Sequence, residues 1–283
     1  MKLVSFSLIF VLLCFPLQSA SAANTTKNVI TLNAGQVDSA DDIEAAIINV
    51  TAQGARPGTV ILDGRSGPFV FSGLDRSLNI FVSNLVLRGV NQAVIKNCDD
   101  GLYFDDFPLA HILVEGIAFF CNGNGVVASG AFRDVTLRDN IFQAGNNGIG
   151  TGGLSSGWLI TDNLIQAGLD GIRIKGAEKM VISNNHLSGN IGIALLQCSQ
   201  FQVRRNAIQA AYQGVLIGQE SWKNRVQANT VLGVSASGIA LEPGVTGNWV
   251  LANRVVCAPG ASCLTIDALP EVAEVNKIAG NQP

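Results

Sequence analysis

Short segments in which apolar and polar side chains alternate recur along most of this chain at a nearly constant interval. In Gly171–Lys175, for example, Ile172 and Ile174 alternate with Arg173 and Lys175, and this period of two predicts a strand with one buried face. Strands of three to five residues cannot bury their apolar sides alone. We therefore predict that successive coils stack around a common core, with equivalent strands paired in parallel about 4.8 Å apart.

Two columns of residues mark the repeat. The first consists of asparagines that lie 21 to 24 residues apart, each with an aliphatic residue three places before it: Asn140, Asn163, Asn185, Asn206, Asn229 and Asn253. The second begins each Gly-Ile or Gly-Val segment: Gly125, Gly148, Gly171, Gly192, Gly214 and Gly238. Because an asparagine amide both donates and accepts hydrogen bonds, we predict that the first column forms a ladder which satisfies buried polar groups.

This repeat resembles the right-handed parallel β-helix of the pectate-lyase-like superfamily, over roughly Leu85 to Ile266. The resemblance implies an all-β, three-sheet solenoid with about 21–24 residues per coil. It places the Gly-Ile strand in the first sheet, the strand before each asparagine in the second and the strand after it in the third. The superfamily includes lyases, hydrolases, epimerases, esterases and non-catalytic proteins, so it does not fix an activity.

Both ends of the chain differ from the coils. At the start, Lys2, an apolar run and Ala20-Ser21-Ala22 are typical of a secretory signal peptide. A capping helix is expected over Ala40–Ala52, with Ser39 as its N-cap, because solenoids need covered ends. The expected organisation is a signal peptide over 1–22 and a single domain over 23–283, made of a cap region (23–64), coils (65–271) and a closing segment (272–283).

Composition limits the partners. The formal net charge is −3 and only 14% of residues are charged, so neither nucleic acid nor an acidic membrane is expected as a partner. No later apolar run is long enough to span a membrane, and the mature protein is expected to be secreted or periplasmic. Some repeats also resemble those of a copper-associated periplasmic accessory protein, but the sequence has only two His and two Met. We therefore expect no metal site and no cofactor.

Five cysteines follow the predicted signal peptide, and export would allow them to form disulfides. Cys257 and Cys263 bracket one loop, whereas Cys98 and Cys121 lie about one coil apart. Each pair can form a disulfide or remain as buried thiols. The odd number leaves Cys198 as the expected free cysteine.

A functional site must be built from outward side chains of neighbouring coils, because inward side chains form the core. On the Gly-Ile strands, Gly150 and Gly152 leave one coil almost bare, and Asp170, Arg173 and Lys175 stand beside it. Arg173 can bind a uronate carboxylate through two hydrogen bonds, and Lys175 can act as a base. These three residues are the candidate catalytic group of a polysaccharide lyase; the alternative is that they are solvated strand residues.

Other residues near this bare coil are candidates for substrate binding. They are Asp100, Tyr103, Asp105, Asn124 and Asn147, together with Trp222, which could stack on a sugar ring. Asp100 and Asp105 also suggest a glycoside hydrolase, which needs two carboxyl groups about 6.5–9.5 Å apart for inversion. Neither histidine has the sequence context of a catalytic site: His186 is expected on the surface and His111 in the packed interior.

Two functional readings remain open. The first is an exported protein that binds or cleaves extracellular polysaccharide, with a lyase ahead of a hydrolase if it is an enzyme. The second is a non-catalytic β-helix that serves as a cell-envelope or binding scaffold.

Overall fold

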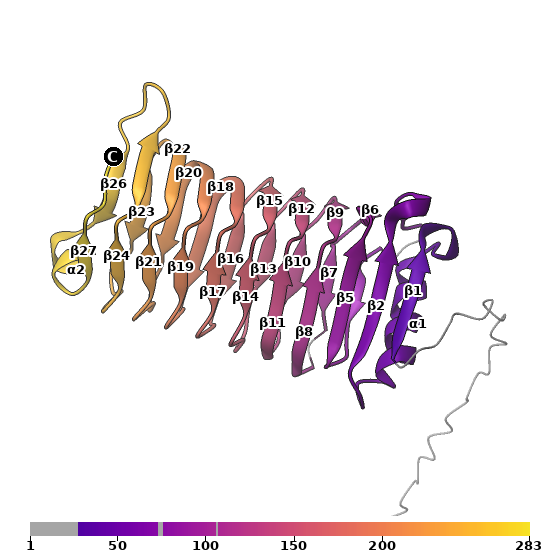
Figure 1. Cartoon of the computed structure of the whole chain (residues 1–283). Coiled ribbons are helices and arrows are strands. Elements are labelled where there is room, and N and C mark those ends of the chain that lie inside the picture. Colours follow the sequence, from indigo (N-terminus) through magenta and orange to yellow (C-terminus); the bar gives the residue numbers. More distant parts are fainter. Residues whose placement is uncertain (1–27, 73–75, 106) are drawn as a thin grey trace, which may run out of the picture.

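The computed structural model describes residues 28–72, 76–105 and 107–283. The predicted signal peptide, residues 1–22, therefore lies outside the described residues. Within them the chain winds into an elongated solenoid whose coils follow one another in sequence order (Figure 1). Every named strand pairing is parallel, for example β11 with β14 and β10 with β13. The predicted right-handed parallel β-helix is confirmed.

The strands that precede the asparagines form one sheet of 11 strands. In spatial order they are β1 (Val29–Asn33), β2 (Gly58–Asp63), β5 (Leu85–Val90), β8 (Leu109–Glu115), β11 (Phe132–Arg138), β14 (Leu159–Thr161), β17 (Val181–Ser183), β19 (Gln202–Arg204), β21 (Arg225–Gln227), β24 (Trp249–Leu251) and β27 (Lys277–Ala279). We call this the asparagine-side sheet.

The other two faces of the solenoid are the Gly-Ile face and the face that follows the asparagines. The Gly-Ile face contains β4 (Leu78–Ile80), β7 (Leu102–Phe104), β10 (Val126–Ala128), β13 (Ile149–Thr151), β16 (Ile172–Lys175), β23 (Ser237–Leu241) and β26 (Leu264–Ala268). The third face contains β3 (Phe69–Val70), β6 (Val94–Cys98), β9 (Ala118–Cys121), β12 (Ile141–Ala144), β15 (Leu164–Ala167), β22 (Thr230–Val234) and β25 (Arg254–Cys257).

Two long strands join these two faces into one sheet of 16 strands. β18 (His186–Leu196) and β20 (Ala207–Ile217) each run through both faces, and their pairing shifts register between Gly189 and Ile191. Earlier coils turn here at a small polar residue, such as Asn147 or Asp170, whereas these two coils have an isoleucine and a glutamine. The register shift leaves Asn190, which follows Gly189, without a partner in this strand pairing.

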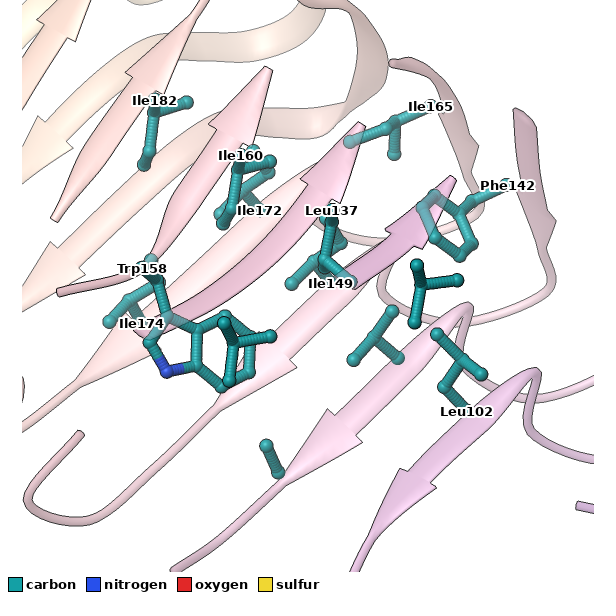
Figure 2. Packing of buried hydrophobic residues seen from close by; sticks show 14 of the residues in the cluster. Leu102, Leu137, Phe142, Ile149, Trp158, Ile160, Ile165, Ile172, Ile174 and Ile182 are labelled. Atoms are coloured by element: carbon teal, nitrogen blue, oxygen red, sulfur yellow. The ribbon is translucent and has the colours of Figure 1, made fainter. Parts of the chain in front are cut away.

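The inward side chains form one continuous apolar core (Figure 2). Ile172 and Ile174 are fully buried, and Arg173 between them is exposed, as the alternation predicts. Phe104, Phe132 and Trp158 cluster inside the early coils, with the ring centroid of Phe104 5.5 Å from each of the other two. Packed aromatic rings of this kind contribute strongly to core stability.

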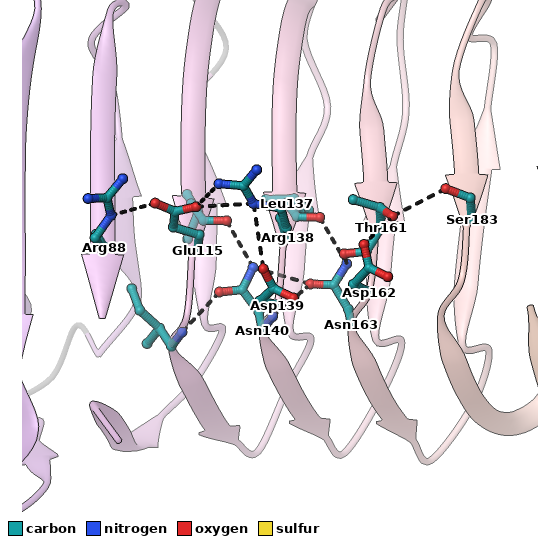
Figure 3. Close-up of polar contacts among 12 residues, drawn as sticks. Arg88, Glu115, Leu137, Arg138, Asp139, Asn140, Thr161, Asp162, Asn163 and Ser183 are labelled. Atoms are coloured by element: carbon teal, nitrogen blue, oxygen red, sulfur yellow. Dashed lines mark hydrogen bonds and ion pairs between the residues drawn. The ribbon is translucent and has the colours of Figure 1, made fainter. Parts of the chain in front are cut away.

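The asparagine ladder is present and continuous, and Figure 3 shows its first pair, Asn140 and Asn163. Each amide nitrogen donates to the amide oxygen of the next rung, as from Asn163 to Asn185 (3.0 Å) and from Asn185 to Asn206 (3.0 Å). Asn281 adds a seventh rung beyond Asn253. A second buried ladder, through Asn224, Asn248 and Asn276, was not predicted from the sequence.

The N-terminal cap follows the expected plan with one addition. α1 (Ala40–Thr51) begins at Ser39, where the backbone N–H of Ser39 donates to Asp42 Oδ2 (3.1 Å) in a capping box. β1 precedes this helix and pairs with β2, so the cap region already contributes two strands to the asparagine-side sheet. Short 3₁₀ turns follow these strands, η1 (Ala34–Gln36) and η2 (Gly64–Ser66). At the other end α2 (Pro270–Glu274) precedes β27.

One packing prediction is wrong. His111 is exposed, with a backbone φ of 59°, and lies 3.5 Å from the carboxylate of Asp134. The pairing of β8 with β11 matches Ala110 to Arg133 and Ile112 to Val135. His111 and Asp134 are therefore equivalent outward residues, and Ile112 takes the core position that was expected for the histidine.

Both candidate disulfides form, between Cys98 and Cys121 and between Cys257 and Cys263, and Cys198 is a buried free thiol. Burial raises the pKa of the Cys198 thiol to about 11. Since the thiolate is the reactive species, we expect a native protein lacking residues 1–22 to show no reaction with a thiol reagent at neutral pH. After unfolding in urea without reductant it should release one thiol per chain. Rapid labelling of the native protein would contradict this expectation.

Candidate functional site

The Gly-Ile face presents its outward residues in straight rows across the coils. Register pairs Tyr103 with Val127, Val127 with Gly150, and Gly150 with Arg173. Arg173 in turn faces Ala194 on β18. At about 4.8 Å per strand, Arg173 lies roughly 14 Å from Tyr103 along the solenoid axis. The structure thus brings these predicted site residues to one face: Arg173 lies next to the bare coil, and Tyr103 lies on its other side beyond the coil of Val127.

The bare coil forms an open floor between those edges. A Cβ atom added at Gly152 would meet no atom within 4 Å, and one at Gly150 would meet the Val126 carbonyl oxygen only at 3.6 Å. We call this surface the glycine trough: Gly150 and Gly152 form its floor, and Arg173 and Lys175 form one edge. Since the floor carries no side chains, an extended ligand can approach the backbone across it.

An ion pair holds the guanidinium at the edge of the trough. Arg173 Nη1 donates to Asp170 Oδ2 at 2.8 Å; the Asp170 side chain is 9% exposed and the Arg173 side chain 48% exposed. A guanidinium has five N–H donors in a fixed plane, so one bond to Asp170 orients it and leaves others for a ligand. Lys175 is exposed two residues further along β16. Asp170 therefore positions Arg173.

Three of the predicted binding residues have hydrogen bonds that stack the coils. Asn124 donates from its side chain to Asp100 Oδ1 (2.9 Å), and Asn147 donates to Asn124 Oδ1 (3.2 Å). The backbone N–H of Asp170 completes the row by donating to Asn147 Oδ1 (3.3 Å). This turn ladder gives Asp100, Asn124 and Asn147 a structural role, and a role for them in substrate binding stays a prediction.

The two acidic residues that suggested a hydrolase lie apart. Asp100 precedes β7 and Asp105 follows it, so an extended strand separates them. Whether their carboxyl groups have the spacing of about 6.5–9.5 Å that inverting glycosidases need stays a prediction. Asp100 is also engaged in the turn ladder.

Trp222 lies away from the trough. It follows β20, two coils beyond the coil of Arg173, and it bridges in register to Ser199 and Thr246 at the turn before the asparagine-side sheet. Its side chain is exposed, with Lys223 Nζ 4.7 Å from the ring centroid. The structure does not bring Trp222 together with Tyr103 or Arg173.

Among residues 28–72, 76–105 and 107–283, no group of three His, Cys, Asp or Glu side chains is placed to hold a metal ion. In the same part of the chain, neither helix has the length and apolar character needed to cross a membrane.

This architecture is similar to those of known proteins. A family model described as "Right handed beta helix region" matches residues 110–255. The DFA-IIIase of Arthrobacter chlorophenolicus A6, solved without its lid in complex with GF2, is 14% identical, covers 90% of this chain and 99% of its own, and has a TM-score of 0.58. An Azotobacter vinelandii mannuronan C-5 epimerase A-module is 13% identical over 89% and 99% of the two chains, with a TM-score of 0.46. A search of curated proteins finds no match.

Proposed function

The chain belongs to the right-handed β-helix family, and from that premise we propose that it is an exported enzyme that cleaves an acidic polysaccharide by elimination in the glycine trough. The observation that carries the proposal is an open glycine floor bordered by a guanidinium that a buried carboxylate orients. A floor of bare backbone suits an extended sugar chain, and an oriented guanidinium suits the carboxylate of a uronic acid.

Each residue of the edge has a distinct part in the proposed reaction. Arg173 binds the uronate carboxylate and stabilises the negative charge that develops when the neighbouring C5–H bond breaks. Lys175, in its neutral form, takes that proton. The electron pair forms the C4–C5 double bond, the glycosidic C4–O bond breaks, and the departing oxygen takes a proton from water. Asp170 touches no reacting atom and acts by holding Arg173.

Export is part of the proposal and has its own support. Residues 1–22 have the pattern of a signal peptide, and the structure contains two disulfides, which persist in oxidising compartments such as the periplasm or the extracellular space. Fractionation of cells that produce the full chain would test this point. Mature protein found only in the cytoplasm would contradict it.

The test is to incubate the mature protein with a panel of uronate polymers and to record the ultraviolet absorbance of the unsaturated product. We expect Lys175→Ala to lower the rate at least about 100-fold, because a general base contributes a factor of about 10²–10⁴. Gly152→Phe should block the trough with little loss of stability, since nothing lies near its Cβ. A matched control is Lys96→Ala, which removes an exposed lysine from another face.

The outcomes separate the alternatives. Release of reducing ends without the unsaturated product would replace elimination by hydrolysis. Retained binding to polymers without any cleavage would indicate the non-catalytic scaffold. Equal loss of activity in Lys175→Ala and Lys96→Ala would remove the catalytic role from Lys175.

A further inference from the structure

A second hollow lies on the asparagine-side sheet, near the C-terminal end of the solenoid. It has a volume of about 760 Å³, and its polar lining comes from the outward residues of β17, β19, β21 and β24 and the turns before them: Lys179, Gln200, Gln202, Lys223, Arg225 and Trp249. A smaller hollow of about 310 Å³ shares Gln202 and Arg225 and adds Arg204 and Arg205. We call the two together the basic groove. In Figure 1 these strands lie in the orange and yellow part of the ribbon.

The cations of the basic groove differ from those at the other end of the same sheet. There, Arg88 and Arg138 flank Glu115 and both donate to its carboxylate (Figure 3). Burial raises the pKa of the Glu115 carboxyl, but the hydrogen bonds from Arg138 and Arg88 outweigh burial and lower it. In the basic groove, Lys223 and Arg225 form no ion pair with any described residue, and Lys179 alone has an acidic partner, Glu178 at 3.0 Å.

Indole rings hold several of these unpaired cations in place. Register places Arg225 and Trp249 of the basic groove in one row with Lys277, which lies next to the groove on the following strand, β27. The guanidinium of Arg225 lies 5.6 Å from the Trp249 ring centroid, and Lys277 Nζ lies 5.0 Å from it. Such contacts favour the cations without neutralising them. The row therefore keeps its positive charge available to a ligand, although the whole chain carries a formal charge of −3.

The spacing of the cations indicates how far apart the anionic groups of a matching ligand lie. Lys179, Gln200 and Lys223 follow one another on successive coils, each with a backbone φ between 54° and 60°. Lys179 and Lys223 are thus two coils apart, as are Arg225 and Lys277, or about 9.6 Å in each case, and Arg204 and Arg205 lie on the coil between Lys179 and Lys223. That distance is comparable to the length of a disaccharide. Duplex DNA is far more densely charged, with one phosphate about every 3.4 Å of axis on each strand.

The neutral residues of the groove fit a sugar chain as well. The amides of Gln200 and Gln202 each offer donors and an acceptor, which match the hydroxyl groups of sugars. Nucleic-acid bases need an aromatic face to stack on, but cations already lie over the Trp249 ring. We propose that the basic groove is a separate binding site for an acidic polysaccharide, which lies along the solenoid axis with its anionic groups on Lys223, Arg225 and Lys277.

This site is on a different face from the glycine trough, so its occupation does not depend on the proposed lyase activity. It would keep a polymer on the protein whether or not the trough cleaves it. The groove residues are exposed, so their replacement should leave the fold intact, which thermal unfolding would verify.

The test measures binding of polygalacturonate to the mature protein by calorimetry, with the methyl-esterified polymer as an uncharged ligand of the same backbone. Lys175→Ala is included in every protein so that cleavage is slowed at least about 100-fold. We expect Arg225→Gln with Lys277→Gln to weaken binding of polygalacturonate at least about tenfold, because two charge-assisted contacts are lost. The matched control, Lys96→Gln with Arg133→Gln, removes two exposed cations elsewhere and should bind as before.

Several results would overturn the proposal. They are equal weakening in the groove and control variants, equal binding of the charged and the esterified polymer, or tighter binding of duplex DNA or of phosphatidylglycerol vesicles than of polygalacturonate. Failure of the trough hypothesis is distinguishable. If the trough hypothesis fails, the protein with Lys175 intact forms no unsaturated product. If the proposal for the basic groove fails, polymer binding does not depend on Arg225 and Lys277.

Discussion

Replacement of Gly214 by alanine is expected to destabilise the protein by about 3 kcal/mol, as overpacking of a tightly packed interior does. A Cβ atom at Gly214 would lie 2.4 Å from the carbonyl oxygen of Gly238 in the next coil and 2.3 Å from Val231 Cγ1. The carbonyl belongs to a paired strand and cannot move without breaking the stack. Urea denaturation followed by circular dichroism would measure the loss in free energy of unfolding.

The matched control for this prediction is Gly152→Ala. Its added Cβ meets nothing within 4 Å, so stability should change by less than about 1 kcal/mol and can even rise, because alanine restricts the unfolded chain. The glycine column repeats the same contact: Cβ atoms at Gly125, Gly148, Gly171 and Gly192 would each lie 2.4–2.6 Å from the next glycine's carbonyl oxygen. Similar stabilities for the two variants would mean that neighbouring coils are less closely packed than the structure shows.

Replacement of Asn185 by alanine is expected to cost about 2–3 kcal/mol, since it leaves several buried groups without partners. The Asn185 amide donates to the Ile160 carbonyl (2.9 Å) and to Asn206 Oδ1 (3.0 Å). Its oxygen accepts from the backbone N–H of Asn163 (3.0 Å). The residue is fully buried, so water cannot replace these bonds.

Asn146→Ala supplies the comparison for the ladder. Asn146 is an exposed turn asparagine that makes only backbone hydrogen bonds, and its replacement should change stability by about 0.5 kcal/mol or less. If Asn185→Ala were equally mild in urea denaturation, the ladder would be a consequence of the stacked coils and would contribute little to holding them together.

The coils could be predicted from the sequence because the contacts that stack them recur at a regular interval. Parallel stacking repeats every contact once per coil, so the residues that satisfy it recur in columns that can be read directly, as with Ile172 and Ile174. Where a coil departs from the repeat, the prediction was less complete. β1 and the second asparagine ladder went unrecognised, because β1 belongs to the first turn and Asn224 begins a ladder of only three coils.

The candidate sites could be predicted only in part, because outward positions were considered on one face of the solenoid. Arg173 and Lys175 could be predicted as candidates because they occupy outward positions of a Gly-Ile strand. Arg225, Trp249 and Lys277 occupy equivalent outward positions on the asparagine-side sheet, and reading that column would have revealed them. Trp222 was predicted to stack on a sugar ring, but its distance from the trough follows from the order of the coils.

The sequence by itself determined the architecture: the period set one coil per repeat, alternation set the buried face, and the asparagines marked the ladder. Only the tertiary structure decided which polar side chains remain available to bind a ligand. Asp100, Asn124 and Asn147 bond to one another across coils, whereas Arg225 and Lys277 retain unpaired charge beside an indole. The physical reason is that the partners of a polar side chain lie on neighbouring coils, more than 20 residues away in sequence, and depend on the exact register between coils.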